Sequence, residues 1–119
     1  VNWEEEMRHE VRFFIFSKHI DLYPQKEVRR MARKELERIR NGKDSVLAEA
    51  RGLGVVVKST KDGYSFEYPE KCDDELKARI RKLFSSDSLA RFNVSQWELD
   101  GATKHEAYFL KLLGEAKAA

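Results

Sequence analysis

The stretch Val11–Phe16 constrains the fold more than any other part of the chain. Burial of one large apolar side chain is worth about 1.5–3 kcal/mol, so a dense run of them must lie inside a core. The run consists of Phe13, Phe14, Ile15 and Phe16, with Arg12 as the charged neighbour. The rest of the chain has to supply the surfaces that cover it.

A helix is the preferred structure for this stretch, and a strand over Val11–Phe16 is the alternative. Asn2 followed by Glu5 matches a capping box, and acidic residues suit the positive end of a helix dipole. The helical periodicity begins before the aromatic run and continues to about Leu22. Its apolar positions are Trp3, Met7, Val11, Phe14 and Ile15. The sequence therefore predicts an N-terminal helix that includes the aromatic run.

The composition predicts a single folded domain over residues 1–119. With 41% hydrophobic and 11% aromatic residues, a chain of this length can build one modest core. One cysteine, Cys72, excludes an internal disulfide and a zinc site made of cysteines alone. No apolar run approaches the ~18–20 residues of a membrane span, and the start does not resemble a secretory signal. We expect an intracellular protein, cytoplasmic or nuclear, without a membrane partner.

Two helices are predicted after the first. Pro24 fits the first turn of a second helix, which would run to about Asn41 and end at Gly42. A short third helix would follow, capped by Asp44 or Ser45. The apolar stripe of the second helix is Val28, Met31, Ala32, Leu36 and Ile39.

An alternating pattern replaces the helical one in the middle of the chain. It flanks Asp62–Gly63, the favoured pair for a two-residue type I′ hairpin turn. This turn would place Val57 opposite Tyr68 and Lys58 opposite Glu67. The residues expected on the buried face are Val55, Val57, Tyr64, Phe66 and Tyr68.

The last third of the chain again favours helices. A fourth helix should start near Asp73, and a capping box of Thr103 and Glu106 should open the final one. Between them, Trp97 and Leu99 are candidates for a third strand. The prediction is thus an α+β fold, mainly helical, with about five helices and one β-hairpin. The order helix, helix, helix, hairpin resembles the layout of winged-helix domains, which bind nucleic acid.

No catalytic or cofactor signature stands out, so a non-enzymatic protein without cofactor or metal is favoured. Glu6 and His9 have the spacing of a metal-binding helix, but the motif lacks a second copy, which favours solvated surface charge. The stretch His19–Asp21 is interpreted as a cap, and His105 as a surface residue of a first helical turn. Cys72 has no evident base, which favours a structural or incidental role.

The clearest functional signal is electrostatic. The net charge is only +2, but basic residues outnumber acidic ones in the second helix. The residues that fall within roughly a 60° sector of the helix are Lys26, Arg29, Arg33 and Arg40. The guanidinium group of arginine suits phosphate oxygens. We therefore predict a small nucleic-acid-binding or regulatory domain that contacts mainly the phosphate backbone. The predicted contact residues are Lys26, Arg29, Arg33, Arg40, Lys43, Lys58 and Lys61.

Two other interpretations stay open. In the first, the arginines of the second helix simply pair with Glu27, Glu35 and acids elsewhere. In the second, the chain is a protein–protein interaction or adaptor module that does not bind nucleic acid. The acidic N-terminal turn would then meet the basic helix of a second copy in a homo-oligomer, or of an unlike protein partner. Exposure of the aromatic residues Trp3, Phe92, Trp97 and Tyr108 would favour this role.

Overall fold

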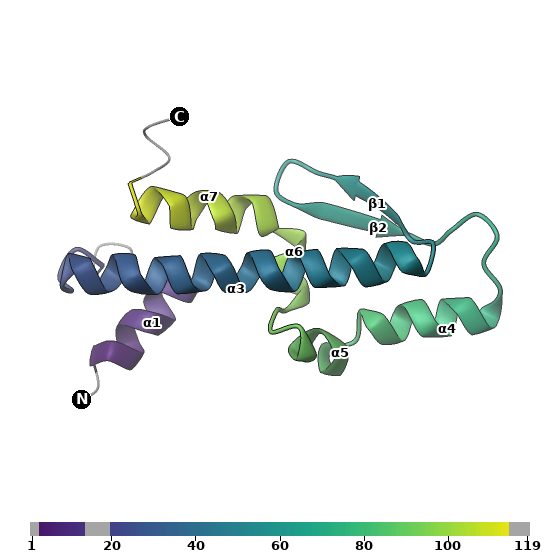
Figure 1. Ribbon diagram of the computed structural model, residues 1–119, viewed down its shortest axis with the longest axis horizontal. Coiled ribbons are helices and arrows are strands. Elements are labelled where there is room, and N and C mark those ends of the chain that lie inside the picture. The colour runs from purple at the N-terminus through teal and green to yellow at the C-terminus, as the bar shows by residue number, and fades with distance from the viewer. Residues whose placement is uncertain (1–2, 14–19, 115–119) are drawn as a thin grey trace. The chain divides into compact units, whose positions relative to one another are not determined.

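The computed structural model describes residues 3–13 and 20–114. The chain is mostly helical, at 68%, and its described residues form six helices and one two-stranded antiparallel hairpin (Figure 1). This confirms the predicted α+β class. The chain divides into two compact units: unit 1 comprises residues 1–37 and 107–119, and unit 2 comprises residues 38–106. The organisation as a single domain stays a prediction.

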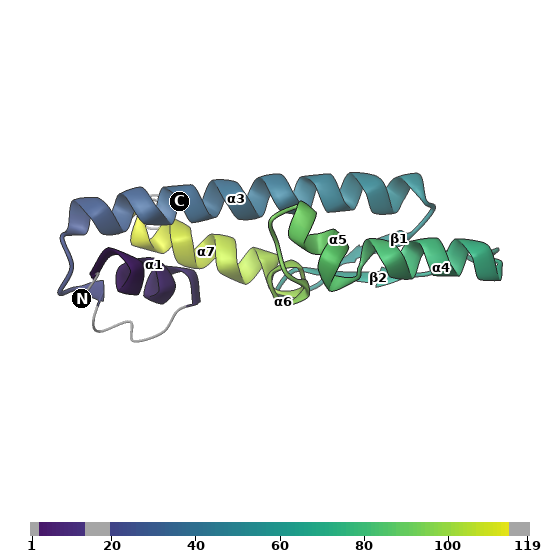
Figure 2. The same cartoon turned by 90° about the horizontal axis from the view of Figure 1, so that it is seen from below.

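Unit 1 is built from three helical segments. They are α1 (Trp3–Phe13), the first part of α3 (Gln25–Gly52) and the second part of α7 (Ala102–Leu112). Figures 1 and 2 show the three segments side by side. The buried apolar residues of the unit are Met7, Val11, Ile20, Val28, Met31, Ala32, Leu36 and Phe109.

Helix α1 confirms the N-terminal helix as far as Phe13. Met7 and Val11 are buried as expected, whereas Trp3 is 40% exposed. The predicted cap at Asn2 and the aromatic residues 14–16 lie outside the described residues.

Helix α3 runs without interruption through Gly42, so the predicted break there is wrong. A Cβ atom at Gly42 would lie 2.4 Å from Val94 Cγ1 and 2.5 Å from the carbonyl oxygen of Phe92. Glycine is therefore needed for close packing inside the helix, at a cost in helix propensity of about 1 kcal/mol. Without a break, residues 25–52 lack the turn between two helices that the winged-helix layout requires.

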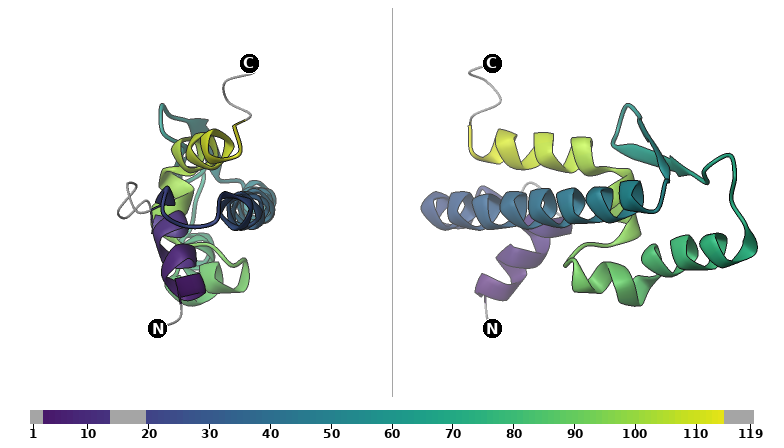
Figure 3. Two further views of the ribbon diagram at one scale, coloured as in Figure 1. Left: turned by 90° about the vertical axis from the view of Figure 1, so that its left-hand side faces the viewer. Right: turned by 45° about the vertical axis from the view of Figure 1, so that its right-hand side comes forward.

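Unit 2 is organised around two apolar clusters of described residues. Besides the second part of α3 and the first part of α7, the unit contains β1 (Val56–Ser59), β2 (Tyr64–Glu67), α4 (Asp74–Leu83), α5 (Ser86–Arg91) and α6 (Gln96–Asp100). One cluster consists of Val46, Leu89, Val94 and Leu99, and the other of Ala50, Val55, Ile80 and Leu83. Because the second cluster takes residues from α3 and α4 and the residue before β1, it anchors both the hairpin and α4. Figure 3 shows the chain passing from the hairpin to α4 near the end of α3.

The hairpin is confirmed, but its turn is not the predicted one. Val57 pairs with Phe66 rather than with Tyr68, and residues 60–63 form the loop. The loop closes because the Thr60 amide donates to the Gly63 carbonyl at 2.8 Å and the Gly63 amide donates to Thr60 Oγ1 at 3.0 Å. Gly63 does not have the positive φ of a type I′ turn. Its Cβ atom would instead lie 2.4 Å from the carbonyl oxygen of Asp100, so a close approach requires glycine here.

The changed register keeps the predicted faces of the strands. Residues 66 and 68 lie on the same face of a strand, so Phe66 still turns toward the core. Val57 and Phe66 pack against the second cluster. Tyr68, expected to be buried, is 45% exposed.

Serine and aspartate caps define the helices after the hairpin. Asp73 caps α4 as predicted, because its Oδ1 accepts from the Leu76 amide at 2.8 Å. Leu99 does not join a third strand, since a capping box of Ser95 and Glu98 opens α6 instead. The residues that follow Asp100 lead directly into α7.

The predicted cap of the last helix is wrong. Helix α7 begins at Ala102, so Thr103 lies inside the first turn, and Glu106 forms ion pairs instead. Gly114 follows the helix with a positive φ of 77°, a conformation that favours glycine at the end of a helix.

Candidate nucleic-acid interface

The first part of α3 carries an exposed basic stripe, which we define as Lys26, Arg29 and Arg33. Spacings of three and four residues place these side chains on one face of the helix. Val28 and Ala32, which lie between them in sequence, are buried. None of the three stripe residues forms an ion pair with a residue that the structure describes. The stripe is therefore a solvent-facing group of positive charges.

Arg30, next to the stripe, is paired within its own helix. Its Nη2 lies 2.6 Å from Glu27 Oε2, and its Nε donates to the same oxygen at 2.8 Å. This is the pairing expected if the arginines of this helix simply pair with nearby acids. Because Arg30 engages Glu27, that carboxylate is not available to neutralise the basic stripe.

The second part of α3 uses its predicted site residues differently. Lys43 Nζ donates to Glu106 Oε1 at 2.6 Å, and Arg40 Nε lies 3.6 Å from Glu106 Oε2. The Lys43 side chain is only 14% exposed, and its ammonium lies 5.9 Å from the centre of the Tyr64 ring. Lys43 is thus a structural cation of unit 2, and Arg40 shares its carboxylate.

The two predicted lysines of the hairpin differ from each other. Lys58 Nζ donates to Glu67 Oε1 at 3.1 Å, which confirms the predicted ion pair, although Lys58 lies directly opposite Ser65. Both side chains are 57% exposed. Lys61, in the loop, is exposed and has no ion pair with a described residue. Of the predicted residues in unit 2, Lys61 alone has no ion pair with a described residue.

The sequence interpretation assigned no role to Arg38, which forms the most buried ion pair of unit 2. Its Nη2 contacts Glu98 Oε2, and its Nη1 donates to Glu98 Oε1 at 3.2 Å and to the Asn93 carbonyl at 2.7 Å. The Glu98 side chain is 1% exposed. The spacing of Ser95 and Glu98 is a capping-box signal that could have revealed part of this arrangement.

His105 is buried, so its assignment to the surface was wrong. It is 2% exposed, and its ring lies 4.4 Å from the half-exposed Trp97 in an edge-on arrangement. Burial lowers the pKa of His105, with further lowering by Lys104 and Arg38 and an opposing effect of Glu98. The imidazole is therefore held in its neutral form as part of the packing of unit 2.

The other titratable candidates do not form a reactive cluster. Glu6 and His9 are exposed on α1, and the His9 ring contacts Phe13 at 4.9 Å. Cys72 is half-buried against the second cluster of unit 2. His19 lies outside the described residues. Within residues 3–13 and 20–114, no group of three or more His, Cys, Asp or Glu side chains is arranged to hold a metal ion.

Glu10 lies in a partly buried polar region of unit 1. Burial and a hydrogen bond with Glu10 raise the pKa of Tyr23, and burial together with the Glu10 charge raises the pKa of Tyr108. Both phenols therefore stay neutral at physiological pH. Trp3 stacks on Tyr23 with ring centres 6.3 Å apart.

Comparison with known proteins adds no assignment to these observations. No family model, no curated protein and no solved structure matches the chain. Among the helices that the structure describes, none combines the length and the apolar character needed to cross a membrane.

Proposed function

We propose that this protein binds nucleic acid through the phosphate backbone and that the basic stripe of α3 is its contact surface. The observation that carries this proposal is the absence of a described carboxylate partner for Lys26, Arg29 and Arg33, although all three are exposed. Arg40 and Lys43 are left out because both pair with Glu106.

The geometry of the stripe suits a polyanion. Neighbouring positions on one helical face lie about 5–6 Å apart at Cβ, and like charges at this spacing destabilise a helix slightly. A row of phosphates would relieve the repulsion among Lys26, Arg29 and Arg33. The two guanidinium groups can also donate paired hydrogen bonds to phosphate oxygens.

Such contacts carry no information about base sequence. The proposed activity is therefore general binding to nucleic acid, with an affinity that falls steeply as salt rises. Lys61 is a further contact candidate on unit 2, because it too is exposed without a described ion-pair partner.

Fluorescence anisotropy with labelled duplex and single-stranded oligonucleotides tests the proposal. The test variant carries Lys26→Gln, Arg29→Gln and Arg33→Gln. Its control carries Lys71→Gln, Lys82→Gln and Arg91→Gln, which removes the same charge from exposed positions of unit 2. The stripe variant should bind more weakly to every sequence at ~50 mM salt, whereas the control should bind like the unmodified protein. Equal losses in both variants, or no binding by the unmodified protein, would overturn the proposal.

A protein-interaction role is the second candidate, and exposed apolar residues of unit 1 favour it. Leu22 is 79% exposed and Trp3 is 40% exposed, so neither side chain is buried in the core and both are accessible to a partner. The exposed acidic first turn of α1, Glu4 to Glu6, offers a complementary charge for the basic stripe of a second copy. Under this role the stripe variant would change the solution mass, measured by light scattering, and would leave oligonucleotide signals unchanged.

A further inference from the structure

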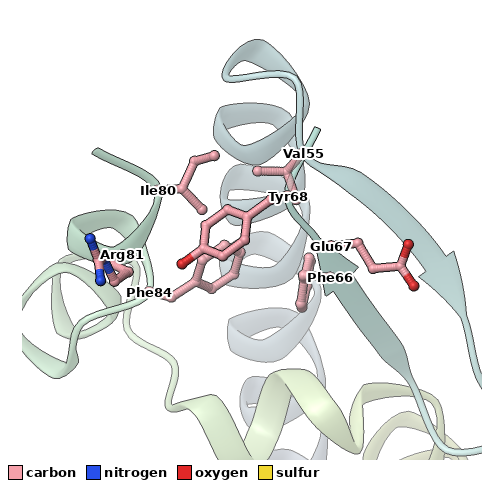
Figure 4. Close-up of a pocket in the computed structure, with 7 residues that line it drawn as sticks. All are labelled: Val55, Phe66, Glu67, Tyr68, Ile80, Arg81 and Phe84. Carbon is pink, nitrogen blue, oxygen red and sulfur yellow. The ribbon is translucent and has the colours of Figure 1, made fainter. Parts of the chain in front are cut away.

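A groove lies between β2 and α4 in unit 2, and no residue of the basic stripe lines it. Its volume is about 630 Å³, and its apolar lining comes from Val55, Phe66, Tyr68, Ile80 and Phe84 (Figure 4). Sites that bind small molecules typically have volumes of ~300–1,000 Å³ and mostly apolar walls. The groove therefore has the size and the lining of a small-molecule site.

The floor of the groove is fixed by the core beneath it. Val55 and Ile80 are each 5% exposed and belong to the second apolar cluster. The rings of Phe66 and Phe84 lie 4.6 Å apart at their centres, with their planes tilted by 47°. This floor presents aromatic and aliphatic carbon to a ligand without needing to rearrange.

Tyr68 forms a wall of the groove, and its exposed ring is not required for packing of the hairpin. Tyr68 is 45% exposed, and it lines the groove together with the residues of the floor (Figure 4). Lys77 Nζ lies 5.9 Å from the centre of this ring. An exposed aromatic ring beside an apolar floor offers a surface that a ligand can cover.

The groove lining contains one acidic residue, Glu67, and one basic residue, Arg81. Glu67 belongs to the lining, but Figure 4 shows its carboxylate pointing away from the apolar side chains, and Lys58 binds it at 3.1 Å. Arg81 is exposed and has no ion pair with a described residue. Lys77 and Arg81 are four residues apart on α4, a spacing that puts two cations on one side of the helix.

We propose that this groove binds a small amphipathic anion: an apolar chain or ring that lies over Phe66, Phe84 and Tyr68, and a carboxylate that accepts hydrogen bonds from Arg81. The apolar floor recognises the body of the ligand, and the basic edge recognises its charge. A compact ligand fits a groove of about 630 Å³, and a carboxylate matches the fork of the arginine side chain.

Titration of the isotopically labelled full chain with decanoate, below its critical micelle concentration, tests this inference by NMR. The amide signals of Tyr68, Ile80 and Phe84 should shift and saturate. Arg81→Gln should weaken binding about tenfold, because it removes a charge-assisted hydrogen bond. Tyr68→Ala changes an exposed wall residue and should also weaken binding while the spectrum of the folded protein is retained.

Arg79→Gln is the matched control. Arg79 lies on the same helix and is also exposed, but it lines a separate hollow with Gly52 and Leu53. Its replacement should leave the decanoate affinity unchanged, and the neutral ligand decanol should bind about tenfold more weakly than decanoate. Shifts confined to other residues, equal affinities in Arg81→Gln and the unmodified protein, or groove shifts with an acidic peptide but not with decanoate would overturn the proposal.

Discussion

The two parts of α3 look alike in sequence and differ in what their cations do. In unit 1, Lys26, Arg29 and Arg33 are exposed and have no described ion-pair partner. In unit 2, Arg38 is bound by Glu98, and Arg40 and Lys43 share Glu106. The same residue types thus provide candidate contact charges in one part and structural charges in the other.

The difference arises from partners that are distant in the chain. Glu98 lies 60 residues after Arg38, and Glu106 lies 63 residues after Lys43. A local charge count registers all these cations as an excess, because it cannot include carboxylates that only the fold brings close. A basic helix therefore supports a prediction of nucleic-acid binding only through those cations that do not pair with carboxylates of the same protein.

The largest effect should come from breaking the buried pair. Arg38→Ala leaves Glu98 charged and 1% exposed, so the free energy of unfolding should fall by about 3–5 kcal/mol. Arg33→Ala, from the exposed stripe, should change it by less than about 0.5 kcal/mol. Chemical denaturation of both variants measures this contrast, and similar losses in the two would contradict the division of α3.

Lys43 should show a smaller effect of the same kind. Lys43→Met keeps the aliphatic stem but removes the hydrogen bond to Glu106, which should cost about 1.5–3 kcal/mol. Lys34→Met is the control, since Lys34 is exposed and has no ion pair with a described residue. A Lys43→Met variant as stable as the control would show that the pairing with Glu106 adds nothing in solution.

Gly42 tests whether α3 is continuous and closely packed in unit 2. Alanine favours a helix, but its Cβ atom would crowd Val94 and the Phe92 carbonyl, so Gly42→Ala should destabilise by about 1–3 kcal/mol. At Gly52 nothing lies within 4 Å of the same atom, and alanine should be tolerated there. Thermal unfolding distinguishes the two, and a Gly42→Ala variant more stable than the parent would contradict the packing.

His105 adds a pH dependence to the paired region. Its pKa in the folded protein is lowered from the ordinary 6.5, so below that pH the unfolded chain takes up the proton more readily. The neutral His105 therefore causes no loss of stability well above pH 6.5. As the pH falls below 6.5, the free energy of unfolding should decrease by up to about 1.4 kcal/mol per pH unit. Denaturation at several pH values between ~7.5 and ~5.5 should show a shallower decline for His105→Gln. Parallel declines would exclude His105 as the cause.

Local signals predicted much of the fold. Asp73 caps α4 through its own neighbours, and the alternating pattern around Asp62–Gly63 located the hairpin. The sequence interpretation failed where contacts with residues distant in the chain determine the local structure. Gly42 was interpreted as a helix end, but it allows Val94 to pack against the middle of α3. Gly63 was interpreted as part of a type I′ turn, but it allows the close approach of Asp100.

The candidate site was only partly predictable for the same reason. Positive charge density on α3 is visible in the sequence, and the stripe Lys26, Arg29 and Arg33 remains a candidate after folding. The role of Glu106 was not visible, because its spacing from Thr103 suggested a cap. The groove between β2 and α4 was also missed, since Tyr68 was expected to be buried.

The most direct test of the division of α3 compares two double variants in the salt dependence of oligonucleotide binding. One carries Arg29→Gln and Arg33→Gln, and the other carries Arg40→Gln and Lys43→Gln, so the two lose the same charge. We predict that the first flattens the log–log slope on duplex DNA by about 1.8, since each lost phosphate contact removes roughly 0.9. The second, assayed at a temperature where it is folded, should keep the slope of the unmodified protein. Equal slopes in the first variant and the unmodified protein would contradict a role for the stripe in phosphate binding.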